Sequence, residues 1–294
     1  MKYFSLNSSS LHILSGDKKL NFLQKILWLI FNFMNNYLRT KKTDKNLKEK
    51  TFQLKRKYVQ NLDNYKNSSP SRILCNMFFL NYDWDFIKLN FERIKILEIG
   101  CGRGVQIELF DKIFNYNYEY LGVDIQMHKE WETLKSDRKK FIVDDYLNID
   151  KYIDNYNIIF SQSVLEHLDN DILLFKKISD NLKHSNKKKM LNLHFFPSVE
   201  CIFTYRGHGI RQYNSSAVSK LSKNFDKNSA SLMHFLGNKE LNLLHKKKFN
   251  RSIFKKENID TASFLNEFKN ILNNNQISSK KNSAFNALEI KTNF

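Results

Sequence analysis

The chain has 294 residues, of which 41% are hydrophobic and 14% aromatic, a composition typical of a globular protein rather than a disordered or fibrous one. A formal net charge of +18 suggests a nucleic acid or an anionic membrane as partner. The excess lies in the flanks: residues 1–70 carry 14 basic and 4 acidic side chains and residues 205–294 carry 16 and 6, against 15 and 17 in residues 94–204. The near-neutral centre weighs against nucleic-acid binding there, and an AT-rich genome would produce the same Lys and Asn bias.

The three cysteines, Cys75, Cys101 and Cys201, stand far apart and form no C-x-x-C pair. This spacing argues against a disulfide framework or a structural zinc site, and it favours a reducing compartment. The first residues show no secretory signal pattern. We therefore expect a cytoplasmic protein.

Residues 20–38 carry polar side chains mostly at three- and four-residue intervals, a pattern typical of a helix with a wide apolar face. The longest apolar run, residues 26–31, is well short of the ~20 residues that span a bilayer. Because basic residues bracket this helix, two interpretations stay open. The helix packs on the protein or on another subunit, or it lies in a membrane interface as a peripheral contact.

Strands and helices alternate through the centre of the chain. We predict strands at 94–99, 118–124, 140–143, 156–161 and 189–195, a sixth within 225–236 and a last one at 285–294. Helical spacing appears at 105–114, 130–136, 147–152, 170–182 and 260–274. This order predicts an α/β fold: a doubly wound, mostly parallel seven-stranded sheet with helices on both faces and an antiparallel last strand.

The predicted domain organisation follows from these elements. Residues 1–70 form a helical, basic N-terminal extension, and residues 71–294 form the main domain with a motif-bearing core at 93–196. Residues 197–213 are the expected substrate region, and residues 237–284 read as an insertion before the last strand. Ligands in such sheets bind at the carboxyl ends of the strands, so the site is expected there.

Three of the eight glycines stand at positions 100, 102 and 104, directly after the first strand. A residue without Cβ lets the backbone turn tightly and approach a ligand there. The spacing departs from the dinucleotide fingerprint G-x-G-x-x-G, and an acid, Glu98, precedes the first glycine. Residues 96–104 (ILEIGCGRG) resemble the E-x-G-x-G-x-G motif of class I S-adenosylmethionine-dependent methyltransferases. Three more motifs of that family follow in order, at 121–124 (LGVD), 144–146 (DDY) and 157–168 (NIIFSQSVLEHL).

The resemblance implies a methyltransferase with S-adenosylmethionine as its cofactor. It implies that Glu98 and the glycine backbone hold the methionine part, that Asp124 accepts the ribose hydroxyls and that Asp145 binds the adenine amino group. Carboxylates suit a cofactor that carries a sulfonium and an ammonium but no phosphate. The full set of cofactor contacts implied is Glu98, Gly100, Cys101, Gly102, Gly104, Asp124, Ile125, Asp144, Asp145, Tyr146, Ser161 and Gln162.

Three histidines are candidates for the base that a hydroxyl acceptor requires: His167, His194 and His208. His208 stands in residues 205–213 (YRGHGIRQY), which resemble the G-H-x-R-x-Y stretch of many small-molecule and sugar methyltransferases. That resemblance assigns Tyr205, His208 and Arg211 to the substrate region, against the alternative of a structural loop. For His167 the alternative is a residue that orients the cofactor loop.

No metal is expected. Some ubiquinone-pathway and small-RNA methyltransferases hold a divalent cation with E-x-x-E-H after the fourth strand, but here Ser163 stands in place of the first carboxylate. Neighbouring Glu166 and His167 would also point apart on a helix.

The expected acceptor is a small molecule or a sugar or polysaccharide precursor, methylated at oxygen. The N/D-P-P-Y-like motif that amino-methylating DNA enzymes use is not found after the fourth strand, where the chain reads SQSV. Two alternatives stay open: an RNA methyltransferase whose basic flanks bind phosphates, and a non-catalytic cofactor-binding or membrane-docked partner protein. The sequence leaves the oligomeric state open.

Overall fold

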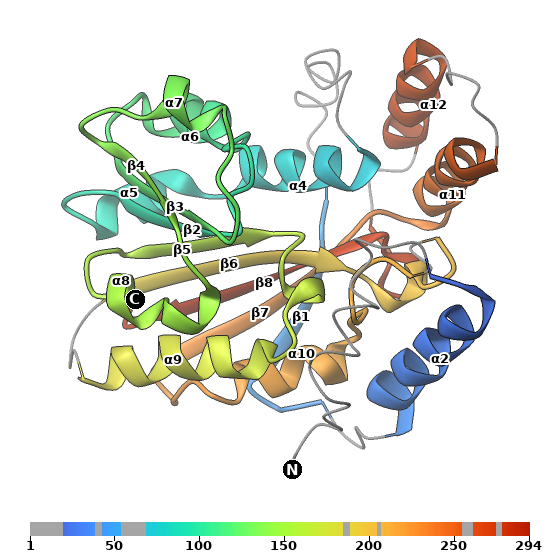
Figure 1. Cartoon of the computed structure of the whole chain (residues 1–294), viewed down its shortest axis with the longest axis horizontal. Helices are drawn as coiled ribbons and strands as arrows, with labels where there is room; N and C mark the ends of the chain where they lie inside the picture. Colours follow the sequence, from blue (N-terminus) through green and yellow to red (C-terminus); the bar gives the residue numbers. More distant parts are fainter. Residues whose placement is uncertain are drawn as a thin grey trace.

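The computed structural model describes residues 20–38, 43–53, 69–184, 189–204, 207–254, 261–274 and 278–294. Within them the chain forms one eight-stranded sheet with helices on both faces (Figure 1). The strands are β1 (Leu47–Thr51), β2 (Lys95–Ile99), β3 (Glu119–Asp124), β4 (Lys139–Val143), β5 (Ile158–Gln162), β6 (Met190–Pro197), β7 (Ser229–Leu236) and β8 (Phe285–Thr292). The predicted α/β class and doubly wound sheet are thereby confirmed.

The strand order is β1-β7-β8-β6-β5-β2-β3-β4, and every neighbouring pair is parallel except the two that involve β8. The order reverses between β2 and β5, which lie side by side although β3 and β4 separate them in sequence. A crevice forms at such a point, beyond the carboxyl ends of the strands. The motifs of the central segment therefore converge at one edge of the sheet.

One strand more is present than the seven predicted. β1 lies within the segment predicted as an N-terminal extension, and it pairs in parallel with β7, with Leu47 opposite Ser231. Only Leu47 of β1 is buried, and the rest of the strand (KEKT) is polar and exposed. An edge strand with one buried side chain carries no alternating hydrophobic pattern, which is why the sequence did not reveal it.

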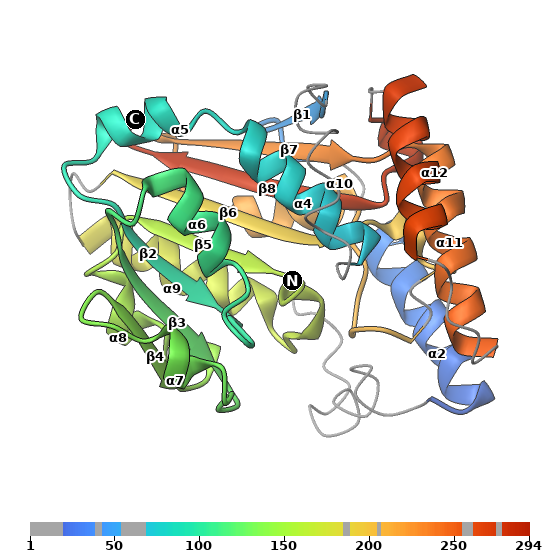
Figure 2. The ribbon, with the colours of Figure 1, turned by 90° about the horizontal axis from the view of Figure 1, so that it is seen from above.

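Two layers of helices bury the two faces of the sheet (Figures 1 and 2). One hydrophobic cluster joins the sheet to α4 (Pro70–Asn81), α5 (Trp84–Asn90) and α6 (Ile107–Phe114). A second cluster on the other face involves α8 (Asp150–Ile153), α9 (Asp171–His184) and α10 (Ser215–Ser222). Within β2, Ile96 belongs to the first cluster and Leu97 to the second, the alternation expected of a strand covered on both sides.

The helices α11 (Lys239–Phe254) and α12 (Thr261–Asn274) lie between β7 and β8, in the region predicted as an insertion. They stand at one end of the molecule together with α2 (Phe22–Phe33), which continues into η1 (Met34–Leu38) (Figures 1 and 2). Among the described helices, none has the length and apolar character needed to cross a membrane. The predicted helix at 20–38 is confirmed, and it packs on the protein, as in the first of the two open interpretations, but through its polar side chains.

Candidate active site

The glycine turn lies at the carboxyl end of β2. The N–H groups of Gly100 and Cys101 donate to the carbonyl of Val123 on β3, at 2.7 and 3.2 Å, which fixes the turn to the neighbouring strand. Gly100 has φ +67°, and a Cβ at this position would overlap the side chain of Val164. Gly104 has φ +75° and packs against Leu134. These two glycines are required by conformation and by close packing.

Gly102 differs from its neighbours because a Cβ there would meet no atom within 4 Å, although its φ is +50°. Its N–H donates to Oδ2 of Asp124 at 2.7 Å, and its carbonyl accepts from the indole N–H of Trp131 at 2.7 Å. Asp124 and Trp131 thus both hold the turn at Gly102. The sequence did not identify Trp131. The space beside Gly102 is thus open, and it could take a ligand.

Apolar side chains surround the carboxyl ends of β3 and β4. Ile125 and Val143 are 66% and 53% exposed, and Leu147 is 43% exposed. Asp124 lies opposite Val143 in the sheet register, so these side chains gather around the carboxylates of the two strands. Exposed apolar side chains beside carboxylates suit a purine ring with a ribose, which supports the fit of S-adenosylmethionine.

The two acids after β4 have different surroundings. Asp144 accepts hydrogen bonds from the hydroxyl of Tyr152, the amide of Asn148 and the N–H of Asp145, each at 2.7 to 2.8 Å. These bonds, that of Tyr152 first, lower the pKa of Asp144 to about 2. Oδ1 of Asp145 accepts from the N–H of Leu147, while Oδ2 makes no hydrogen bond within the described residues. Asp145 is therefore better placed than Asp144 to accept from a ligand.

Glu98 is 2% exposed at the end of β2, and its Oε2 accepts a hydrogen bond of 2.8 Å from the hydroxyl of Tyr120. Burial raises the pKa of Glu98 to about 8, although the bond from Tyr120 acts in the opposite direction. A cation placed beside Glu98 would offset this burial penalty. The carboxyl is thus suited to a positively charged ligand group.

The raised pKa of Glu98 predicts a pH-dependent stability. Because the folded protein holds this proton more tightly than the unfolded chain, the free energy of unfolding should fall as pH rises toward 8. The effect of Glu98 on stability is clearest between pH 6.5 and 8. Below that window the buried His194, whose pKa is lowered to about 3 in the folded protein, acts in the opposite direction, because its imidazole takes up a proton in the unfolded chain. Glu98→Gln should reduce this slope by about 1 kcal/mol per pH unit in urea-unfolding series.

The control for this series is Glu108→Gln, whose side chain is 79% exposed and should leave the slope unchanged. An identical slope in wild type and Glu98→Gln would show that Glu98 is ionised in the folded protein. Burial also raises the pKa of Glu166 to about 8, so part of the slope should remain in Glu98→Gln.

The remaining predicted cofactor residues line the base of the same edge. Cys101 and Ser161 are buried, and the hydroxyl of Ser161 lies 2.8 Å from Nδ1 of His194. The side-chain amide of Gln106 donates to that of Gln162. The hydroxyl of Tyr146 donates to Asp169. Ser161 is thus fully buried and its hydroxyl faces His194, so its side chain does not reach a ligand.

Three side chains converge immediately after β5. The segment η4 (Leu165–His167) is a single 3-10 turn rather than an α-helix, so Glu166 and His167 do not point apart as predicted. One ligand atom each of Glu166, His167 and His208 lies within 4.8 Å of the others, and the two imidazole rings stand edge to face at 4.9 Å. Such a group could accept or donate a proton, or hold a cation. The expected absence of a metal therefore stays a prediction.

The loop that carries His208 is bent around Glu166. Gly207 and Gly209 have φ of +80° and +69°, and a Cβ at Gly209 would lie 2.8 Å from Cγ of Glu166. Glu166 is 1% exposed, and its Oε2 makes no hydrogen bond within the described residues. The two-glycine sequence was the signal for this loop, but its partner Glu166 was not predicted.

Two other predicted residues have different surroundings from those expected. His194 is 0% exposed and lies against Phe175 of α9, because β6 is covered on both faces. Arg211 is also buried: Nη1 lies 2.5 Å from Asp171, and Nη2 donates to the carbonyl of Asp169 at 2.8 Å. His194 is therefore not accessible to an acceptor, and the guanidinium of Arg211 serves an internal ion pair rather than a substrate. Tyr205 lies outside the described residues.

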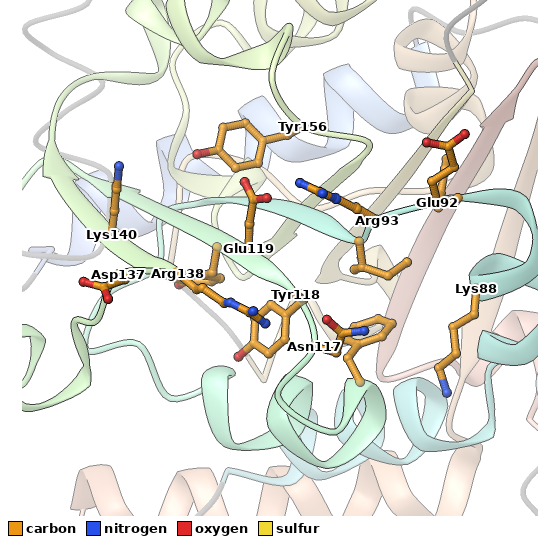
Figure 3. A pocket seen from close by; sticks show the side chains of 14 residues that line it. Lys88, Glu92, Arg93, Asn117, Tyr118, Glu119, Asp137, Arg138, Lys140 and Tyr156 are labelled. Carbon is orange, nitrogen blue, oxygen red and sulfur yellow. The ribbon is translucent and has the colours of Figure 1, made fainter.

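A hollow of about 760 Å³ lies at the opposite edge of the sheet (Figure 3). Its lining comes from the amino ends of β2, β3 and β4, and it mixes basic and acidic side chains such as Arg93, Arg138 and Glu119. The glycine turn and the histidines lie at the other edge, so this hollow is not the site that the motifs build.

The chain is similar to one family model and to several solved methyltransferase structures. A family model of the methyltransferase domain matches residues 78–191, and no curated protein matches the chain. Among solved structures, the plantazolicin methyltransferase BamL, in complex with a desmethylPZN analog and SAH, is 13% identical, with a TM-score of 0.47 over 81% of this chain and 91% of that one. A putative sarcosine dimethylglycine methyltransferase from Galdieria sulphuraria is 11% identical, with a TM-score of 0.44 over 74% and 85% of the two chains. A SAM-dependent methyltransferase from Archaeoglobus fulgidus is 16% identical, with a TM-score of 0.44 over 80% and 100%.

Proposed function

We propose that the chain, whose residues 78–191 match a methyltransferase-domain model, is a class I S-adenosylmethionine-dependent methyltransferase that methylates a hydroxyl oxygen of a small molecule or of a sugar or polysaccharide precursor. The observation that carries the proposal is the group formed by Glu166, His167 and His208. It follows β5 directly, and Val164, the residue before η4, packs on Gly100 of the glycine turn. This arrangement supports a proton acceptor next to the proposed cofactor cradle.

The proposed cofactor contacts are those that the resemblance to the methyltransferase motifs implies, and the open space at Gly102 supports them. Asp124 accepts the ribose hydroxyls, Oδ2 of Asp145 accepts from the adenine amino group, and Glu98 with the backbone at Gly102 holds the methionine part. S-adenosylmethionine supplies an electrophilic methyl group on a sulfonium. The chain itself provides alignment and exclusion of water, which are the main requirements of an in-line displacement.

The proposed base is His208, with His167 beside it and the buried carboxyl of Glu166 as the positioning group. A hydroxyl must lose its proton as the new O–CH₃ bond forms and the S–CH₃ bond breaks, and a ring nitrogen of His208 takes that proton. Imidazole titrates near neutral pH, so it suits this role. Transfer to an amine, by contrast, has no such need of a base if the amine binds in its neutral form.

His208→Ala should lower kcat by roughly 10² to 10⁴-fold, the usual range for a lost general base, while the affinity for S-adenosylmethionine stays within about twofold. Transfer of labelled methyl to a metabolite extract, together with cofactor titration, measures both. His184→Ala is the matched control, because His184 lies exposed at the end of α9. A variant that binds the cofactor and retains full turnover would exclude His208 as the base.

The alternative acceptor is RNA, bound through the basic flanks. The cofactor edge is lined by carboxylates, which favours an acceptor that is not a polyanion. An affinity for RNA that falls steeply with salt, together with methyl transfer to RNA, would replace the proposed acceptor by this one.

We further place the reaction in the cytoplasm, with peripheral contact to a membrane through the helix at 20–38. Cys75, Cys101 and Cys201 are free and buried, as suits a reducing compartment. The membrane contact is supported separately, by the exposed apolar side chains of that helix.

A further inference from the structure

Helix α2 buries its polar face and exposes its apolar face, which is the reverse of an ordinary surface helix. Its asparagines face the protein: Nδ2 of Asn32 donates to the carbonyl of Ile210 at 3.3 Å, and its Oδ1 accepts from the N–H of Gln212 at 2.6 Å. Nδ2 of Asn36 donates to the carbonyl of Gln212 at 2.9 Å. The indole of Trp28 donates to the carbonyl of Gly209 at 2.7 Å. The polar stripe thus satisfies the backbone of the loop that carries His208.

The apolar face of the same helix consequently points outward. Its large side chains are between 38% and 77% exposed, and successive members follow helical spacing along one side. These residues, called here the outer face of α2, are Phe22, Leu23, Ile26, Leu27, Ile30, Phe33 and Tyr37. A contiguous apolar surface of this kind marks an interaction site.

The size of the outer face argues against a second copy of the chain. Together α2 and η1 extend roughly 25 Å, and a face about 10 Å wide offers a few hundred Å², below the ~800 Å² that each partner buries in a standard interface. A lipid surface sets no such requirement, since an amphipathic helix lies in the interface along its own length.

The charge around the helix selects the type of lipid. Between Lys18 and Lys42 the sequence holds six basic and no acidic residues. Basic residues beside an interfacial helix bind anionic headgroups, at about 1 kcal/mol for each cation near the surface. Electrostatic attraction and apolar burial therefore act together.

We propose that the outer face of α2 docks on an anionic phospholipid surface, so that the asparagines on the inner face hold the loop 207–214 and its His208 next to that surface. In both views α2 lies beyond the carboxyl ends of β6 and β7, at the same edge as the glycine turn (Figures 1 and 2). The acceptor is then one presented at a membrane, for example on a lipid carrier. The docking specifies the peripheral membrane contact of the proposed function, and the acceptor rests on the proposed methyl transfer, which the docking itself does not require.

The test is flotation of the full-length protein with phosphatidylcholine vesicles that contain about one-third phosphatidylglycerol, or none. We expect the protein to float with the anionic vesicles and to bind the neutral ones at least about tenfold more weakly. Leu27→Glu and Ile30→Glu should each reduce binding to anionic vesicles by about tenfold or more, because a charge on the outer face cannot enter the apolar layer. Since both side chains are exposed, both variants should fold.

Leu89→Glu is the matched control, because Leu89 is 88% exposed on α5, at a distance from α2, and should leave binding unchanged. Binding that is equal for wild type and the two outer-face variants would overturn the proposal. A concentration-dependent dimer that Ile30→Glu dissociates, without vesicle binding, would also overturn it and assign the face to a second copy. Cofactor binding, measured on the same samples, tests the proposed function separately.

Discussion

Asp124→Ala is expected to weaken the binding of S-adenosylmethionine by roughly 10² to 10⁴-fold. Asp124 ends β3, and its carboxylate already fixes the turn through the N–H of Gly102 at 2.7 Å, while Oδ1 accepts from the N–H of Gln126 at 3.1 Å. Removing it takes away the proposed acceptor of two ribose hydroxyls and also the hydrogen bonds that hold the turn. Two hydrogen bonds to a charged group, at about 1.5 to 3 kcal/mol each, account for the expected factor.

Isothermal titration calorimetry measures this loss, with thermal unfolding as a check that the variant is folded. Asp85→Ala is the control, since the Asp85 side chain is 92% exposed on α5 and should leave the affinity unchanged. If folded Asp124→Ala binds the cofactor as wild type does, then the ribose contact is not at Asp124.

Gly100→Ala and Gly102→Ala should fail in different ways although they stand two residues apart. A Cβ at Gly100 would overlap Val164, and φ is +67°, so Gly100→Ala should lose several kcal/mol of folding stability. At Gly102 a Cβ would meet no atom of the protein, so only the positive φ acts, at a cost of about 1 to 2 kcal/mol. The Cβ of Gly102→Ala would instead occupy the cradle, and we expect the affinity for S-adenosylmethionine to fall at least about tenfold.

Chemical unfolding and calorimetry on the same samples separate the two effects. Val164→Ala, added to Gly100→Ala, should recover the steric part of the stability loss but not the part due to φ. A Gly102→Ala protein that binds the cofactor normally would show that the open space at Gly102 is not the cradle.

The strands of the centre and the cofactor motifs could be predicted because they depend on local patterns. Short apolar runs, a glycine turn and acids after successive strands are visible in a single sequence, and parallel topology brings them to one edge. The predicted strand at 156–161 is β5 (Ile158–Gln162), within two residues at its start and one at its end.

The orientation of α2 could not be predicted, because periodicity gives the two faces of a helix but not which of them is buried. Asn32 and Asn36 determine which face is buried, because they donate hydrogen bonds to backbone carbonyls more than 170 residues away in sequence. A loop with several backbone groups to satisfy outweighs the burial of the apolar face.

The burial and the partners of the candidate side chains also depend on contacts between residues far apart in sequence. All eight residues of β6 are buried, so the strand gives no alternation from which the inward direction of His194 could be inferred. Asp171 begins α9 whereas Arg211 lies in the loop before α10, and neither residue alone suggests an internal ion pair. His208 became a candidate because its segment resembles the G-H-x-R-x-Y stretch, and the glycines on either side of it have positive φ.

Transfer from S-adenosylmethionine labelled with ¹³C at the methyl group, to a metabolite extract that contains lipid-linked sugars, tests the central claim most directly. NMR of the products distinguishes methyl bound to oxygen from methyl bound to nitrogen or sulfur. We predict a new methoxy signal with the wild-type protein that is lost with His208→Ala and kept with His184→Ala. Products with methyl on nitrogen alone, or a methoxy signal of equal strength with His208→Ala, would contradict hydroxyl methylation by this site.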